Sequence, residues 1–222
     1  MADIWKIGQE TNAADFYEKS KHIGFIKSEI IAAKIIAKVC DKMSESYEEI
    51  LADQNEYLID LNEELAEIEN LQNELNAQIK AQEEERSSIL EKTEDEELSE
   101  EDKARLNEIN NTIDQLTNDT NSKIAGINTD IDNKSKEADK NISKKSIAMD
   151  YGNTAIEKGT PLANTQDKRK SFWRRLSGSW DKSATREAGK LAVDAGNNLI
   201  EQVESSVEIE KEIKLKAQNK KV

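Results

Sequence analysis

The side chains that most often perform catalysis or bind metals are scarce in this sequence of 222 residues. His22 is the only histidine and Cys40 the only cysteine, so no zinc site of the usual Cys/His type can be assembled. No phosphate-binding loop of the form G-x-x-x-x-G-K occurs, and nothing resembles a nucleophile elbow or a Cys–His pair. The sequence therefore predicts no catalytic residue, no metal site, no cofactor and no small-molecule substrate.

Carboxylates are the one abundant class of reactive side chain. The chain has 46 Asp and Glu against 32 Lys and Arg, a formal net charge of −14. Catalysis by two carboxylates needs one of them buried in a cleft so that its pKa shifts, and long solvated helices offer no such cleft. The negative charge also opposes binding to a phosphate backbone, which argues against nucleic acid as a partner.

The densest acidic run extends from Glu83 to Asp102 and is interrupted only by Arg86 and Lys92 among basic residues. Its centre would form the acidic tip of a helical hairpin, with the residues Glu94, Asp95, Glu96 and Glu97. Such a tip can hold a basic partner, or it can simply keep two helices soluble, and both interpretations are open.

A basic and aromatic segment, Lys168–Trp180, reads KRKSFWRRLSGSW. Cations are interleaved with apolar residues in it, and the three-and-four spacing of Phe172, Trp173, Leu176 and Trp180 would place these on one helical face. The segment is a candidate contact with an acidic partner or an anionic membrane surface. Alternatively, its tryptophans fill the base of a bundle while the arginines stay hydrated. The candidate residues are Lys168, Arg169, Lys170, Phe172, Trp173, Arg174, Arg175 and Trp180.

Small side chains line one face of the predicted C-terminal helix. A face of this kind lets a second helix approach closely, so we assign it as a candidate assembly face. Its residues are Ala184, Ala188, Gly189, Ala192, Ala195 and Gly196.

The elements that would position these groups are helices. Charged residues make up 35% of the chain, aromatic residues 5%, and there is a single proline, which suits long solvated helices. Residues 1–43 are predicted to contain one amphipathic helix from about Ala13 to Asp41, because Ile23, Ile30 and Val39 belong to one apolar stripe at helical spacing.

Residues 44–150 are predicted to form a coiled-coil hairpin with its turn near 93–99. Two heptad stripes of aliphatic residues flank the turn, and Ser99 with the following acidic residues has the pattern of a helix N-terminus. Folding the chain near Glu96 pairs Leu61 with Ile131 and Ile68 with Ile124 in one register. The two stripes therefore predict an antiparallel pair of helices.

The remaining chain is divided by its glycines and its proline. Residues 151–182 are predicted to be a connector with at most a short helix, because Gly152, Gly159, Pro161 and Gly178 fall there. Residues 183–222 are predicted to form a C-terminal helix. The expected fold is all-α: a long antiparallel coiled-coil hairpin with the N- and C-terminal helices packed at its base as a small bundle.

These features favour a non-enzymatic structural or interaction protein that self-assembles, as a homo-oligomer, or binds a protein partner. Bacterial secretion or injection apparatus, surface filaments and virions use proteins of this design. One alternative is a membrane-binding or membrane-inserting helical protein that uses segment 168–180. Another is a cytosolic adaptor or chaperone that holds a basic client with its acidic arm.

The first residues lack the basic, apolar and cleavage regions of a signal peptide. We therefore expect synthesis in the cytoplasm without a cleaved signal, while export by a signal-independent route or membrane association is left open.

Overall fold

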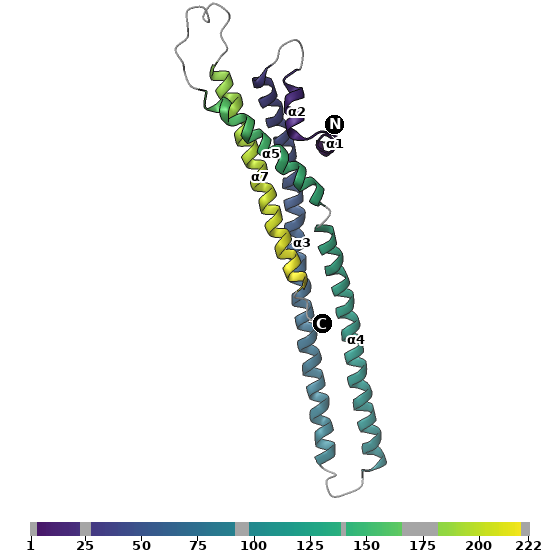
Figure 1. Cartoon of the computed structure of the whole chain (residues 1–222). Helices are drawn as coiled ribbons and strands as arrows, with labels where there is room; N and C mark the ends of the chain where they lie inside the picture. The colour runs from purple at the N-terminus through teal and green to yellow at the C-terminus, as the bar shows by residue number, and fades with distance from the viewer. Residues whose placement is uncertain (1–3, 23–27, 92–97, 139–140, 166–181, 219–222) are drawn as a thin grey trace, which may run out of the picture. The chain divides into compact units, whose positions relative to one another are not determined.

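The computed structural model describes residues 4–22, 28–91, 98–138, 141–165 and 182–218 (Figure 1). Almost all of these residues are helical, and none is in a strand. The helices are α1 (Ile4–Glu10), α2 (Ala13–Ser20), α3 (Glu29–Glu91), α4 (Glu100–Ala138), α5 (Ile142–Ala163) and α7 (Lys182–Gln218). The predicted all-α class is confirmed.

The chain divides into two compact units. We call Met1–Glu56 with Ala138–Lys211 the bundle unit, and Tyr57–Glu137 with Glu212–Val222 the hairpin unit. The bundle unit holds the larger core, in which Ile36, Met43, Tyr47, Tyr151 and Leu199 are fully enclosed.

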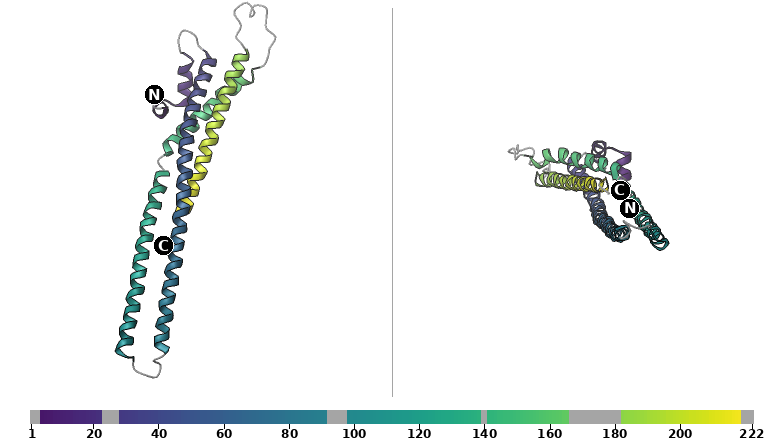
Figure 2. Two further views of the ribbon diagram at one scale, coloured as in Figure 1. Left: turned by 180° about the vertical axis from the view of Figure 1, so that it is seen from behind. Right: turned by 90° about the horizontal axis from the view of Figure 1, so that it is seen from below.

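Within the bundle unit, α3 and α7 run parallel while α5 runs antiparallel to both. Two hydrogen bonds set the α3–α7 register, from Asn198 Nδ2 to Ser44 Oγ and from Gln202 Nε2 to Glu48 Oε1, and each joins residues 154 positions apart. The Cys40 thiol donates to the backbone oxygen of Tyr151 on α5 at 3.6 Å. Figure 2 shows α5 and α7 side by side.

Paired glycines bring the backbones of α5 and α7 together. A Cβ added to Gly189 would lie 2.7 Å from the carbonyl oxygen of Gly159, and one added to Gly196 would lie 2.7 Å from that of Gly152. Both distances are too short for a real side-chain carbon. The two pairs lie seven residues apart along each helix, so a single antiparallel register places both of them.

The N-terminal residues form two short helices on α5 rather than the beginning of one long helix. The N-terminus of α2 is satisfied by side chains: Asn12 accepts from the backbone N–H of Asp15, and Asp150 of α5 accepts from that of Ala13 at 2.8 Å. Trp5 of α1 stacks edge-on against Tyr47 and donates to Ser46 Oγ. α2 ends at Ser20 and α3 begins at Glu29, so the prediction of a single helix over 13–41 is wrong.

The hairpin unit contains the second part of α3 and α4 up to Glu137, side by side in Figures 1 and 2. The N-terminus of α4 follows the prediction, because Ser99 Oγ accepts a hydrogen bond from the backbone N–H of Asp102. Four aliphatic residues of the two predicted register pairs are buried, and so is one further residue of α4. They are Leu61, Ile68, Ile109, Ile124 and Ile131.

Two predicted boundaries differ from the structure. α3 is continuous through residues 41–44, because Cys40, Met43, Ser44 and Tyr47 are all buried along the same face and no breaker residue intervenes. α5 continues past Tyr151 to Ala163, through two glycines and with Pro161 in its last turn. Glycine has a low helix propensity, but here the close packing of α5 against α7 that the glycines permit outweighs it. The part of the predicted connector from Tyr151 to Ala163 is therefore helical, and its residues 166–181 lie outside the described residues.

Candidate partner-binding groove

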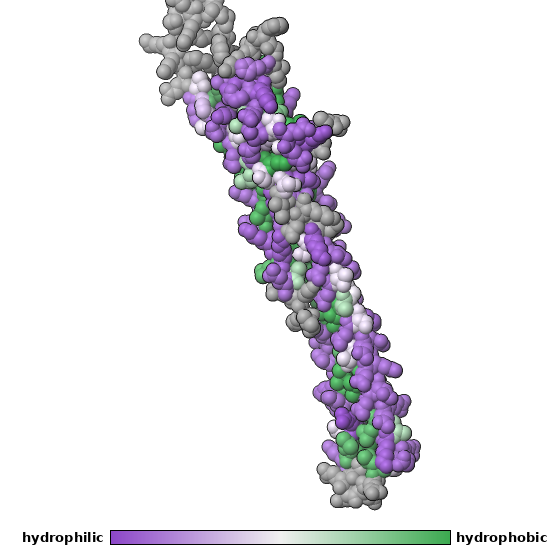
Figure 3. All heavy atoms as spheres, turned by 45° about the vertical axis from the view of Figure 1, so that its right-hand side comes forward, coloured by the Kyte–Doolittle hydropathy of each residue, from purple (hydrophilic) through white to green (hydrophobic). Residues whose placement is uncertain are grey.

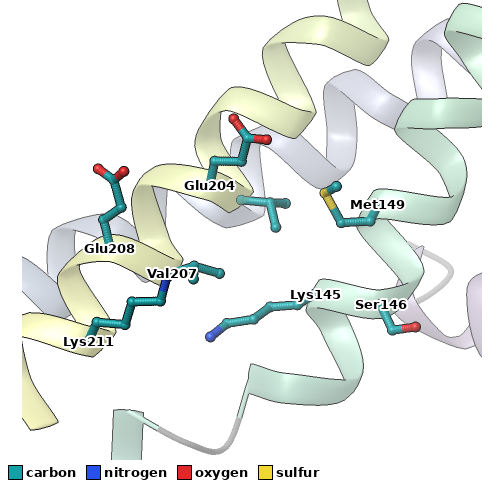
Figure 4. A pocket seen from close by; sticks show the side chains of 8 residues that line it. Lys145, Ser146, Met149, Glu204, Val207, Glu208 and Lys211 are labelled. Carbon is teal, nitrogen blue, oxygen red and sulfur yellow. The ribbon is translucent and has the colours of Figure 1, made fainter.

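A groove of about 350 Å³ lies between the first two turns of α5 and the second half of α7, within the bundle unit (Figure 4). Three residues of α5 and five of α7 line it: Lys145, Ser146, Met149, Val203, Glu204, Val207, Glu208 and Lys211. All of these residues belong to the bundle unit.

The groove opens where the glycine pairing ends. Counting seven residues back from Gly152 leads to Lys145 on α5, and counting seven residues on from Gly196 leads to Val203 on α7. These positions repeat the glycine pairs in the same register, but they carry side chains that keep the backbones apart. The space between the helices is therefore partly open to solvent instead of being closed by backbone contact.

The floor of the groove is apolar and its rim is charged. Val203 is buried, Met149 and Val207 are half-buried, and Glu204, Glu208 and Lys211 are exposed. Figure 4 shows Glu204 and Glu208 projecting from the outer side of α7, whereas Lys145 extends from α5 toward α7.

Lys145 is held by an ion pair with Glu210, and both side chains are largely buried. A paired cation and anion in this position neutralise each other, so they add little net charge to the rim. The uncompensated charges of the groove are consequently those of Glu204, Glu208 and Lys211.

A polar layer occupies the α3–α7 contact near the groove. Gln54 of α3 is 2% exposed and Ser206 of α7 is fully buried. Neither side chain finds a hydrogen-bond partner within the part of the chain that the structure describes. By the offset of 154, Gln54 lies within a turn of Ser206 and Glu210.

Two core residues of the bundle unit, Cys40 and Tyr151, have raised pKa values. Burial, with a smaller contribution from the Asp41 carboxylate, raises the pKa of the Cys40 thiol to about 12. Burial likewise raises the pKa of Tyr151 to about 12, with added repulsion from Asp150. Such groups stay neutral at physiological pH and serve as packing residues.

The predicted small-residue face lies inside the bundle unit. Ala188, Gly189, Ala192, Ala195 and Gly196 are buried, and Ala184 is half-buried. The helix that approaches this face closely is α5 of the same chain. The face is therefore occupied within one molecule and is not a free surface.

The other two predicted sites lie outside the described residues. This holds for the acidic tip, Glu94–Glu97, and for the basic and aromatic segment, Lys168–Trp180. Their roles stay predictions. Sequence reasoning did not identify the groove, although the change from glycine to Lys145 and Val203 in a seven-residue repeat could have indicated it.

The described residues contain neither a metal site nor a membrane-spanning helix. No cluster of His, Cys, Asp and Glu there has the arrangement of a metal site. Among the helices described, none combines the length and the apolarity needed to cross a membrane. On the face drawn in Figure 3, hydrophilic residues prevail and hydrophobic residues form small separate groups.

Comparison of the chain with protein-family models, curated proteins and solved structures finds no match. The residues and geometry described above are accordingly the basis for any statement about function.

Proposed function

We propose that this chain is a non-enzymatic helical protein that works by binding a protein partner, and that the α5–α7 groove is a contact site for that partner. The observation that carries this proposal is an apolar floor, formed by Met149, Val203 and Val207, bordered by exposed charges. Grooves between two helices with this pattern accept the apolar face of a third helix.

Partner binding takes precedence over self-assembly in this proposal. The small-residue face that was the candidate for assembly is already covered by α5, so a second copy would have to use another surface. The net charge of −14 on each copy also opposes association of like chains. A coiled-coil character of the hairpin, and a place in secretion apparatus, a filament or a virion, remain compatible predictions from sequence pattern.

Site-specific photo-cross-linking tests the proposal. A benzophenone amino acid replaces Val207 in the groove or, as a matched control, Leu191, an apolar residue of the same helix that is 48% exposed but does not line the groove. Each variant is irradiated in extract from the source cells. We expect a discrete adduct of higher mass from position 207 and none from position 191.

A second groove position, Met149 on α5, should yield the same adduct as Val207, because both border the same floor. Equal labelling at positions 191 and 207, or no adduct from either groove position, would contradict the proposal. Light-scattering mass of the purified chain distinguishes a foreign partner from a second copy.

A further inference from the structure

One stretch of α7 is acidic, and basic residues follow it at Lys211, Lys214 and Lys216, of which Lys211 lines the groove. From Ala195 to Glu210 the helix contains Glu201, Glu204, Glu208 and Glu210 and no lysine or arginine. Glu210 is paired with Lys145. The other three carboxylates are exposed, and no ion pair to them is formed by the residues that the structure describes.

These three carboxylates are neighbours on the helix surface. Glu204 and Glu208 are four residues apart, and Glu201 precedes Glu204 by three. Like charges at these spacings destabilise a helix by about 0.2–0.5 kcal/mol per pair. A cation brought by another molecule would relieve this repulsion, whereas a further anion would increase it.

The acidic row borders the apolar floor over its length. Glu204 and Glu208 line the groove together with Val203 and Val207, which are offset by one residue along the same two turns of α7. A ligand seated on the valines therefore passes within reach of both carboxylates. The groove volume of about 350 Å³ is at the low end of ligand pockets, which fits a few aliphatic side chains from a helix better than a large cofactor.

We propose that the groove binds a basic amphipathic helix of another protein. Aliphatic side chains at i and i+4 of that helix fill the space over Met149, Val203 and Val207, and its lysines or arginines pair with Glu204 and Glu208. This inference rests on the proposed function and specifies the chemistry of the partner. A foreign helix is favoured over a second copy because two chains of charge −14 repel each other.

Three synthetic peptides test the chemistry against the full chain. The first is a helical peptide with leucines at i, i+4 and i+7 flanked by lysines. The second has every lysine replaced by glutamate, and the third has every leucine replaced by serine. Fluorescence anisotropy measures the Kd of each. We expect measurable binding of the first peptide alone. Salt should weaken the contribution of its lysines to binding, whereas the contribution of its leucines should be retained at high salt.

Variants of the rim identify the site. The double variant Glu204→Gln/Glu208→Gln should weaken binding of the leucine–lysine peptide about fivefold, as expected from losing two exposed ion pairs. The matched control Glu187→Gln/Asp194→Asn removes the same charge from exposed positions of α7 outside the groove. It should leave the Kd within about twofold of the parent value. All four side chains are exposed, so folding is preserved and circular dichroism can verify this.

Three results would overturn the inference: equal weakening by the rim and control variants, equal binding of the glutamate peptide, or no binding of the leucine–lysine peptide. If light scattering gives the mass of two chains for the parent protein and of one chain for Val207→Asp, the groove binds a second copy of this chain and not a foreign helix. If Val207 still cross-links a foreign protein while the peptides fail, the proposed function survives and only the partner chemistry is wrong.

Discussion

Two helical glycines, Gly189 and Gly126, have opposite surroundings. A Cβ on Gly189 would lie 2.7 Å from the Gly159 carbonyl oxygen and 2.8 Å from a backbone carbon of Leu162, whereas a Cβ on Gly126 would meet nothing within 4 Å. Backbone cannot move aside as a flexible side chain can. At the scale of single residues, the role of each glycine is therefore decided by what lies opposite it.

We predict that Gly189→Ala lowers the free energy of unfolding by about 1–3 kcal/mol, because α5 and α7 must separate to admit the methyl group. Gly126→Ala should raise it by about 0.5–1 kcal/mol, because alanine has the higher helix propensity and the site is open. Urea unfolding followed by circular dichroism measures both. A stabilising Gly189→Ala would show that the helices are not in backbone contact.

Cys40 gives the bundle unit a dependence on alkaline pH. Its thiol has a pKa of about 12 in the folded chain against a usual value of 9.0. The neutral form is thus favoured by folding. Its contribution is complete below pH 9 and is lost progressively as the pH rises toward 12.

We predict that the free energy of unfolding declines more steeply between pH 9 and pH 10 in the parent chain than in Cys40→Ala. Tyr17 and Tyr151, whose pKa values rise from 10.0 to about 12, add their own decline mainly above pH 10. Urea titrations at several pH values give the two slopes, independent of any constant loss of packing in the variant. If the free energy of unfolding declines equally steeply with pH in the two proteins, the thiol ionises equally in the folded and the unfolded chain.

At the scale of elements, the hairpin unit joins α3 to α4 through a few specific contacts. Lys134 of α4 reaches two carboxylates of α3, at 2.6 Å from Glu64 and 3.2 Å from Asp60. Burial alone would lower the pKa of Lys134, but the hydrogen bonds that its amine donates to Glu64 and Asp60 outweigh burial, so the pKa is raised. The amine is thus a charged link between the helices.

We predict that Lys134→Met destabilises the hairpin unit by about 1 kcal/mol, because Asp60 and Glu64 then repel each other without a cation. Adding Asp60→Asn and Glu64→Gln to that variant should restore most of the lost stability. The control is Lys103→Met, which breaks an exposed pair with Glu100 inside α4 and should have almost no effect. Thermal unfolding of the four proteins decides whether Lys134 matters as a link between helices.

Exposed positions can report the antiparallel register. We predict a short separation between spin labels at Glu69→Cys of α3 and Lys123→Cys of α4, in a Cys40→Ala background. Labels at Glu69→Cys and Glu108→Cys should lie farther apart, since 15 residues of helix span about 22 Å. Pulsed electron resonance gives both distances. Equal distances would rule out the register predicted from the two aliphatic stripes.

At the scale of the whole molecule, α3 belongs to two units with different cores. Its first part is buried at Ile36, Cys40, Met43 and Tyr47, whereas residues 69–91 contain no fully buried side chain. Helical hydrogen bonds are similar along α3, but the packing that protects them is not. The resistance of backbone amides to local opening should therefore decrease along this one helix.

We predict that amides of residues 36–47 exchange with solvent at least about a hundredfold more slowly than those of residues 75–90, a difference of roughly 3 kcal/mol in opening free energy. Hydrogen exchange followed by mass spectrometry resolves the two segments. Uniform protection along α3 would mean that the two units open together.

The sequence alone was sufficient for the fold class, the antiparallel hairpin and the Ser99 cap, because helical periodicity and capping are encoded in neighbouring residues. The tertiary structure alone decided that Gly152 and Gly159 lie inside a helix, that α2 is separate from α3, and that a groove opens at Lys145 and Val203. Each of these depends on residues thirty or more positions away in the chain. The local helix propensity of a segment carries no information about its packing partner, and these features are determined by the packing partner.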